Sequence, residues 1–460
     1  MDIYKKTMKK IIIFQLIICF MTLCCSCGLN LDKKAENHEN DKKKISIYSL
    51  EFDQTMQDAI LRFKNENPDV IVNEEFIEKP SNMRTRLNTE LMAGEGPDII
   101  KGNLSMFNSI YKILNTGVFC DINEFIKNDK ELDMSVYNTS VINTGIYNGK
   151  RYFIPLGFAA PYLWTTKNAL GNSDISFDMN NWTWDQMKEK GKLFINNSKG
   201  GGERYIFPDQ YSLLYCLLMT GGINYIDYSE RKAYFDTPQF MELLETYKSL
   251  CNDILSENYQ EKYSNGYYDM YKENSLFAVV GPDGKALNPG MLWMLNSSVK
   301  SFLNEDILLY SFPTRKKEEK PMANITSIVA INNSSESKQS AYNFVKLLLS
   351  KEAQTSDYFM NCEGIPVNNE AIDFMIKKYN GSEGVSKIVT NSVEIPTVSL
   401  PMDLAEQAKK VVIGIEKCEI IDQSVLRFIV EEVQNFMEGE ISATQAGEKI
   451  NNKVQLFLSE

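Results

Sequence analysis

A regular alternation of strand-like and helix-like segments after residue 44 constrains the fold of this chain more than any other feature. Residues 44–50 interleave polar and apolar side chains, as a short strand does, and residues 53–67 carry apolar side chains at helical spacing up to Asn67-Pro68. The alternation continues with a strand at 70–76, a helix at 82–93, a strand at 97–102, a helical segment at 104–114, and later a strand at 325–332 and a helix at 337–349. Because strands joined through helices pair in parallel, this order predicts an α/β fold with mostly parallel sheets flanked by helices.

The chain is long enough to form two hydrophobic cores. It has 460 residues, of which 43% are hydrophobic and 24% are charged. Lys and Arg number 49 against 61 Asp and Glu, which gives a net charge of -12 and makes a polyanion such as nucleic acid a poor partner. We therefore expect a two-domain globular protein that binds no nucleic acid.

Several kinds of catalytic site are excluded by the residues that the sequence lacks. The only histidine is His38, in the strongly charged stretch 33–43, so a Ser-His-Asp triad and a His-ligated metal site are ruled out in the folded part. Gly94-Glu95-Gly96 is followed by Pro97 and lacks the third glycine of a dinucleotide-binding loop. Carboxylate-pair and lysine-based mechanisms remain open on the residues alone, but we expect no metal, no cofactor and no catalytic residues.

The first 27 residues have the pattern of an export signal. Four lysines precede the apolar run 11–23, which ends in Cys-Cys-Ser-Cys-Gly. The segment resembles a bacterial lipoprotein signal, in which a cysteine after a small residue is acylated and becomes the new N-terminus. Cys27, preceded by Ser26, is the predicted acylation site, with Cys25 as a second candidate and an uncleaved anchor helix as the alternative. Residues 28–43 would then form a flexible tether at the outer face of the cell membrane.

A series of short motifs in the rest of the chain resembles the extracellular solute-binding proteins of ABC importers, in particular the sugar-binding family that includes maltose-binding protein. The first is Leu-Met-Ala-Gly-Glu-Gly-Pro-Asp-Ile-Ile at 91–100, and the others follow in the family's order across nearly the whole chain. They are the segments 148–157, 164–170, 182–185 with Thr183 as a helix N-cap, 221–222, 278–282, 311–313 and 364–367.

The resemblance implies two α/β lobes, with a hinge that the chain crosses three times, near 157–161, 321–324 and 350–353. The N-terminal lobe would contain residues 44–157 and 324–350, and the C-terminal lobe residues 160–321 and 353–460. A solute would bind in the cleft between the lobes, where the carboxyl ends of the strands meet.

A sugar is the solute that the resemblance implies, and the residue types near the expected cleft are compatible with it. A sugar ring presents apolar C–H faces and a rim of hydroxyls, so its site needs aromatic platforms bordered by carboxylates and amides. The candidate ligand-binding residues are Glu51, Phe52, Asn103, Phe158 and Tyr162 near the N-terminal lobe, and Tyr211, Asp283 and Trp293 in the C-terminal lobe.

Some of these candidates have an alternative explanation. Tyr211 shares a helical stripe with Leu214 and Leu218, and such stripes usually face a core. Trp182 and Trp184 stand at a helix start and are expected to be packing anchors. Trp293 follows the turn-rich sequence 281–290, which predicts an exposed indole in or near a loop, and the alternative is that it covers an edge of the core.

The expected function is capture of an extracellular sugar or oligosaccharide and its delivery to the permease subunits of an ABC transporter. We expect a monomer that is not an enzyme. Two alternatives stay open. One is an exported ligand sensor for a membrane partner, and the other is a secreted glycoside-processing enzyme, which would need a pair of carboxylates about 5 to 10 Å apart.

Overall fold

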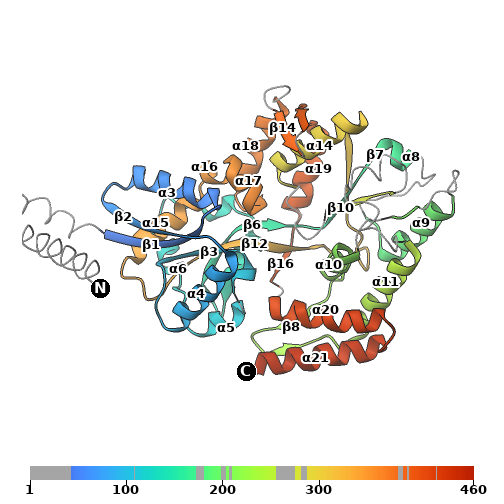
Figure 1. The fold of residues 1–460 in the computed structure, drawn as a ribbon, viewed down its shortest axis with the longest axis horizontal. Coiled ribbons are helices and arrows are strands. Elements are labelled where there is room, and N and C mark those ends of the chain that lie inside the picture. The colour runs from blue at the N-terminus through green and yellow to red at the C-terminus, as the bar shows by residue number, and fades with distance from the viewer. Residues whose placement is uncertain are drawn as a thin grey trace, which may run out of the picture.

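The computed structural model describes residues 43–107, 109–171, 181–197, 204–206, 210–254, 275–280, 287–381, 387–390, 393–420 and 422–459. Two lobes lie side by side along the long axis of the molecule, and strands run from one to the other (Figure 1). The expected two-lobe α/β architecture is confirmed. No helix among the described residues is both long enough and apolar enough to cross a membrane.

The first lobe is built on a mixed sheet that continues into the hinge. Its strand order is β13 (Ile365–Pro366), β6 (Phe153–Ala159), β12 (Met322–Ile331), β3 (Ile99–Gly102), β1 (Lys43–Leu50) and β2 (Val70–Ile77). β1 pairs in parallel with β2 and β3, as expected, whereas β12 is antiparallel to both β3 and β6.

The helices of the first lobe follow the sequence pattern closely. They are α3 (Gln54–Glu66), α4 (Pro80–Met92), α5 (Ile110–Asn115) and α15 (Lys338–Leu349). The side chain of Asp53 accepts a hydrogen bond from the backbone N–H of Met56 and thereby caps α3, while Phe63 of α3 packs edge-to-face on Phe344 of α15. The helical spacing of apolar residues therefore placed the buried face of α3 correctly.

The second lobe has an antiparallel sheet, so the expectation of a mostly parallel sheet in this lobe is wrong. Its strand order is β10 (Ala278–Val280), β7 (Tyr162–Thr166) and β11 (Ile307–Ser311). β7 leaves the hinge directly after β6, and β11 leads back to the hinge and into β12. A strand that leaves a hinge and one that returns to it run in opposite directions, which explains the antiparallel pairing.

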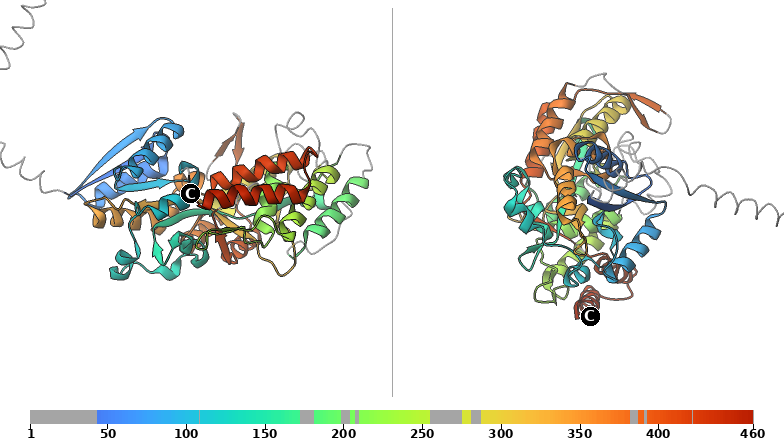
Figure 2. Two further views of the ribbon diagram at one scale, coloured as in Figure 1. Left: turned by 90° about the horizontal axis from the view of Figure 1, so that it is seen from below. Right: turned by 90° about the vertical axis from the view of Figure 1, so that its left-hand side faces the viewer.

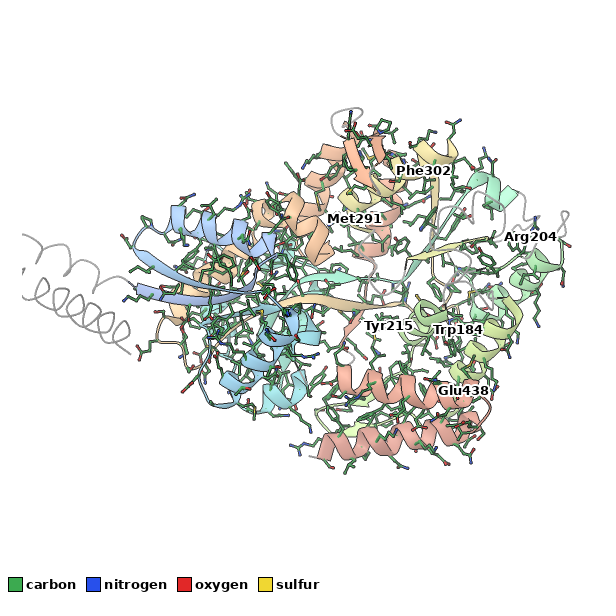
Figure 3. All side chains as sticks on the ribbon, in the orientation of Figure 1. Trp184, Arg204, Tyr215, Met291, Phe302 and Glu438 are labelled. Atoms are coloured by element: carbon green, nitrogen blue, oxygen red, sulfur yellow. The ribbon has the colours of Figure 1, made fainter. Side chains whose placement is uncertain are left out.

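Helices surround this sheet, and α20 and α21 lie beside each other along one side of the lobe (Figure 2). The helices are α9 (Trp184–Asn196), α10 (Gln210–Thr220), α11 (Pro238–Ile254), α20 (Gln423–Met437) and α21 (Ala443–Ser459). Thr183 caps α9 in a capping box with Gln186, as predicted. Trp182 and Trp184 are buried and donate their indole N–H groups to backbone carbonyls, so their expected role as packing anchors is confirmed (Figure 3 labels Trp184).

Three strands meet at the hinge. β6 passes into β7 through Ala160 and Pro161, and β12 begins at Met322, in agreement with the first two expected crossings. A short strand, β16 (Lys417–Glu419), pairs in parallel with the start of β12.

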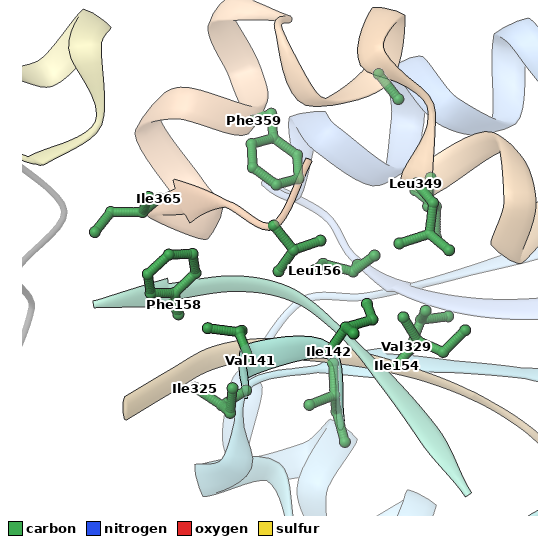
Figure 4. Close-up of a cluster of buried hydrophobic side chains, with 14 of the residues drawn as sticks. Val141, Ile142, Ile154, Leu156, Phe158, Ile325, Val329, Leu349, Phe359 and Ile365 are labelled. Carbon is green, nitrogen blue, oxygen red and sulfur yellow. The ribbon is translucent and has the colours of Figure 1, made fainter. Parts of the chain in front are cut away.

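A further group of helices packs in one hydrophobic cluster with the first lobe and with β7 and β11 of the second-lobe sheet. These are α14 (Pro289–Leu303), α16 (Lys351–Gln354), α17 (Asp357–Glu363), α18 (Asn369–Asn380) and α19 (Met402–Ile413), which lie above the hinge in Figure 1. Figure 4 shows their contact with the hinge, where Phe359 and Ile365 lie against Leu156 and Phe158 of β6. These helices thus pack against parts of both lobes at the hinge, and the second hydrophobic cluster includes the chain again from Val425 of α20.

The remaining elements are short. They are η1 (Leu104–Met106), α6 (Asn123–Asn128), η2 (Met134–Val136), α7 (Thr139–Ile142), η3 (Asn143–Gly145), β4 (Ile146–Tyr147), β5 (Lys150–Arg151), α8 (Lys167–Gly171), β8 (Ile226–Asp227), β9 (Lys232–Ala233), β14 (Lys387–Thr390) and β15 (Val393–Pro396).

Candidate ligand-binding site between the lobes

The carboxyl ends of β1 and β3 lie next to each other at one edge of the first sheet. The two strands pair through Ile47 and Ile99, so the residues that follow them reach the same edge. Glu51, Phe52 and Asn103 are all exposed there, with 61% of the surface of Phe52 accessible. These three residues therefore have the exposed strand-end position that the sequence predicted for them.

A buried lysine lies beside this edge, between two carboxylates. The Nζ of Lys101, on β3, is 2.6 Å from Oδ2 of Asp53 and 2.6 Å from Oε1 of Glu363. The Lys101 side chain is only 5% exposed and that of Glu363 only 3%, whereas Asp53 keeps 17% of its surface in contact with solvent. Buried charges are stable only when they are paired, and here the amine is paired twice.

The two carboxylates decide the charge of this amine. Burial by itself lowers the pKa of Lys101, but the fields of Glu363 and Asp53 and their hydrogen bonds outweigh burial and raise that pKa. Lys101 therefore stays protonated at every physiological pH. With both carboxylates ionised, the three side chains carry one net negative charge next to the exposed edge.

Glu363 also connects the group formed by Lys101, Asp53 and Glu363 with the hinge through its backbone. Its backbone carbonyl accepts a hydrogen bond from the hydroxyl of Thr326 on β12. The same carbonyl oxygen lies 2.0 Å from the position that a Cβ atom on Gly157 of β6 would take. Only glycine fits at position 157, and Glu363 thereby contacts both long strands that pass between the lobes.

A second region of interlobe contact contains several aromatic side chains. The ring of Tyr111, on α5 in the first lobe, stacks on the ring of Tyr228, in the turn between β8 and β9 of the second lobe, with an interplanar angle of 13°. A cavity of about 160 Å³ adjoins this stack, lined by Tyr111, Tyr225, Ile226, Tyr228, Phe235, Glu419, Ile420, Val425 and Ile429. It therefore contains residues of both lobes and of the hinge strand β16.

An open groove of about 570 Å³ shares Ile226, Tyr228 and Glu419 with this cavity. Its other lining residues are Gly222, Ile223, Asn224, Asp227, Tyr234, Thr237, Gln239 and Arg315. The groove combines two tyrosines with amides and carboxylates. Its volume is in the range of small-molecule sites, and its polar side chains suit a ligand with several hydrogen-bonding groups.

The basic groups in this region are already bound to neighbouring residues. Arg315 donates from Nε to the carbonyl of Gly221, and its two terminal nitrogens contact Glu242 and Glu319. The amine of Lys417 lies 2.7 Å from Oε1 of Glu419. No group of His, Cys, Asp and Glu among the described residues has the arrangement of a metal site.

Two of the predicted site residues lie in the core, which corrects their expected position beside an open cleft. Phe158 is fully buried, because its strand β6 is covered by β13, where Ile365 is its partner (Figure 4). Tyr162 is also fully buried, since β7 lies between β10 and β11. Neither side chain offers surface to a solute in this structure.

The expectation of an exposed indole at Trp293 is likewise wrong. Asn288 caps α14 and Pro289 occupies its first turn, so the Asn-Pro-Gly sequence that predicted a turn instead starts a helix. Trp293 is 7% exposed, stacks on Tyr379 at 4.8 Å, and donates its indole N–H to the carbonyl of Val398 at 2.7 Å.

The other predicted residues cannot be placed. Tyr211 belongs to α10, but its side chain lies outside the described part of the chain. Asp283 and Cys27 are outside the described residues altogether.

Sequence reasoning missed Asp53, Lys101, Glu363, Tyr111 and Tyr228. A lysine inside an otherwise apolar strand was a usable signal for Lys101, because lysine is almost never fully buried without a partner. No comparable signal marks Glu363 or Tyr228, since their partners are supplied by segments more than a hundred residues away.

The chain belongs to the bacterial extracellular solute-binding protein family, whose model matches residues 48–355. This family consists of proteins that bind solutes rather than enzymes. No curated protein matches the chain.

Solved structures of such proteins share the fold. The sugar-binding protein MalE from the phytopathogen Xanthomonas citri is 15% identical, with a TM-score of 0.68 over 91% of this chain and 98% of that one. An ABC substrate-binding protein from Listeria monocytogenes, in complex with cycloalternan, is 14% identical, with a TM-score of 0.62 over 91% and 100%. The GacH receptor of Streptomyces glaucescens, solved unliganded and with acarbose, is 14% identical, with a TM-score of 0.61 over 91% and 99%.

Proposed function

We propose that this protein captures an extracellular sugar or oligosaccharide between its two lobes and delivers it to the permease of an ABC importer. The observation that carries the proposal is the position of the aromatic cavity and its groove, where Tyr111 of the first lobe, Tyr228 of the second lobe and Glu419 of the hinge meet. A solute in contact with all three would favour one arrangement of the lobes over another, which is what a capture protein requires.

The side chains of this region suit a saccharide. Tyr228 and Tyr234 supply aromatic faces for C–H groups, while Asn224, Gln239 and Glu419 supply amide and carboxylate groups for hydroxyls. Structural neighbours named for a sugar, or solved with cycloalternan or acarbose, support this class of ligand. The exposed residues Glu51, Phe52 and Asn103 would extend the contact along the first lobe.

We also propose that the protein works at the outer face of the cell membrane, as a monomer held there by acyl chains on Cys27. The export-signal pattern of residues 1–27 and the extracellular nature of the family support this location. Intact-mass measurement of membrane-extracted protein tests the anchor, because acylation at Cys27 adds lipid mass to a chain that starts at that residue. A mature N-terminus at Gly28 or later without lipid mass would reject it.

A thermal-shift screen with mono- and oligosaccharides tests the binding function. A ligand that binds only the folded state raises the unfolding midpoint, by about 2.7 kcal/mol of stability at a hundred times its Kd. We expect at least one oligosaccharide to raise the midpoint and to be recovered chemically unchanged. If no saccharide shifts the midpoint while amino acids or peptides do, the sugar assignment fails and the capture role stands.

A further inference from the structure

We infer that the interlobe site selects solutes by charge, so that it binds neutral or amino-bearing saccharides and rejects those that carry a carboxylate or a phosphate. The inference rests on the proposed function and specifies the class of saccharide. Three groups of charges carry it, and in two of them a basic side chain is bound by two carboxylates.

The group at Lys101 lies closest to the exposed edge of the first lobe. One amine lies between the carboxylates of Asp53 and Glu363, so the group has one more negative than positive charge. Because Lys101 and Glu363 are shielded from water, salt and solvent screen this excess less than they would at an exposed site. Asp53 is partly exposed and brings the excess charge to the surface.

The second group borders the open groove of the second lobe. Arg315 is the only arginine or lysine among the described residues that line this groove, and its side chain is 9% exposed. Two carboxylates, those of Glu242 and Glu319, bind its terminal nitrogens, and the carbonyl of Gly221 binds the third. The nitrogens of a guanidinium with these partners are already used, so it cannot form the pair of parallel hydrogen bonds by which arginine binds a ligand carboxylate or phosphate.

The third group lies at the hinge strand and at α5. Lys417 contacts both Glu419 and the side-chain oxygen of Asn224. Lys112 lies over the ring of Phe457, 4.7 Å from its centre. These cations are engaged with the protein itself, whereas Glu51 adds a further exposed carboxylate at the strand ends.

Among the described residues that line the cavity and the groove, an anionic solute therefore meets carboxylates and a single cation, Arg315, that is already bound to two carboxylates. One uncompensated charge about 10 Å away, at an effective dielectric constant of about 20, changes a dissociation constant on the order of tenfold. A neutral saccharide keeps its hydrogen bonds, because its hydroxyls donate to carboxylates and both donate to and accept from amides. An ammonium group on the sugar gains from the same field.

Equilibrium dialysis with a defined mixture tests the inference. The probes are maltotriose and cellotriose as neutral trisaccharides, fully deacetylated chitotriose (a trimer of glucosamine) as the amine and trigalacturonate as the anion. Mass spectrometry identifies what the protein retains. Retention of a neutral trisaccharide or chitotriose without trigalacturonate is the expected result. Retention of trigalacturonate as tightly as the others overturns charge selection while leaving saccharide capture intact, and retention of none overturns the proposed function together with this inference.

Two substitutions that change the charge of the Lys101 group but hardly its shape test the effect of charge on affinity. Glu363→Gln and Asp53→Asn each remove the excess charge, and Asn at position 53 keeps an oxygen to cap α3. Each should strengthen binding of trigalacturonate about tenfold and leave the affinity for the retained neutral trisaccharide unchanged. Glu131→Gln is the control, since Glu131 is 85% exposed and pairs with Lys346 on the first lobe. Equal affinities for trigalacturonate in the unmodified protein and the three variants would overturn the role of the Lys101 group. If Glu363→Gln fails to fold, the result for Asp53→Asn decides.

Discussion

Lys101 and Glu363 are 262 positions apart in the sequence, yet the Nζ of one lies 2.6 Å from Oε1 of the other. The contact joins the end of a first-lobe strand to the helix α17 beside the hinge. Because the Glu363 carbonyl also accepts from Thr326 and packs on Gly157, one residue connects the expected solute-binding edge with both hinge strands. The side chain of Glu363 thus takes part in the charged group at the site, while its backbone contacts both strands of the hinge.

Replacing Lys101 with methionine should destabilise the protein by about 3–5 kcal/mol, because it leaves Asp53 and Glu363 close together without their shared cation. Urea denaturation measures the loss. Lys346→Met is the control, since Lys346 is 30% exposed and its ion pairs should contribute less than about 1 kcal/mol. Similar losses of stability in the two variants would contradict the expectation that the buried ion pairs of Lys101 matter more than the exposed ones of Lys346.

Gly157→Ala should destabilise the protein by about 1–3 kcal/mol or more, because the new Cβ would lie 2.0 Å from the carbonyl oxygen of Glu363. Gly381→Ala is the matched control, since nothing lies within 4 Å of a Cβ there and its φ is negative. Thermal unfolding of both variants should show a lower midpoint only for the hinge substitution. An unchanged midpoint in Gly157→Ala would mean that Glu363 is not held against β6.

Trp293→Ala should cost about 3–5 kcal/mol of folding stability, because it empties a buried position that stacks on Tyr379. The affinity of the folded protein for a saccharide should stay within a factor of about two. A urea melt beside a calorimetric titration separates the two effects. A large loss of affinity with an unchanged melt would instead make Trp293 a ligand platform.

Asp422, the N-cap of α20, should make the free energy of unfolding larger at acidic pH than at neutral pH. Burial raises the pKa of Asp422, although hydrogen bonds from Ser109, Ser424 and Ile110 partly oppose this. The folded state thus holds the proton more tightly than the unfolded state, so this residue adds stability as the pH falls through its folded pKa, and the full contribution is present below about pH 3.9.

Comparison with Asp422→Asn isolates this effect, because asparagine caps a helix equally well and does not titrate. The unfolding free energy of the unmodified protein should rise relative to that of the variant between pH 7 and pH 4. Asp403→Asn, at an exposed position in the first turn of α19, should show no such trend. A difference that is constant with pH would contradict the raised pKa.

Local pattern was enough to predict most of the first lobe. The strand at 44–50, the helix that Asp53 caps and the helix at 337–349 are formed by residues that are near one another in the sequence, and each is confirmed. The capping box at Thr183 was predictable for the same reason.

The features that the sequence did not reveal depend on contacts between distant segments. Trp293 follows turn-forming residues, but Asn288 and Pro289 also suit a helix start, and Tyr379 decides between the two by covering the indole. Phe158 stands at a hinge crossing, yet β13 arrives from two hundred residues later and buries it. Composition and periodicity contain no information on such partners.

Small-angle scattering with and without the oligosaccharide that gives the largest thermal shift tests the central claim most directly. If the two lobes close on a solute held between them, the radius of gyration should fall at saturation, and the sugar should be recovered unchanged. An unaltered radius of gyration with a bound oligosaccharide would contradict capture by lobe closure, and recovery of a cleaved sugar would favour an enzyme instead.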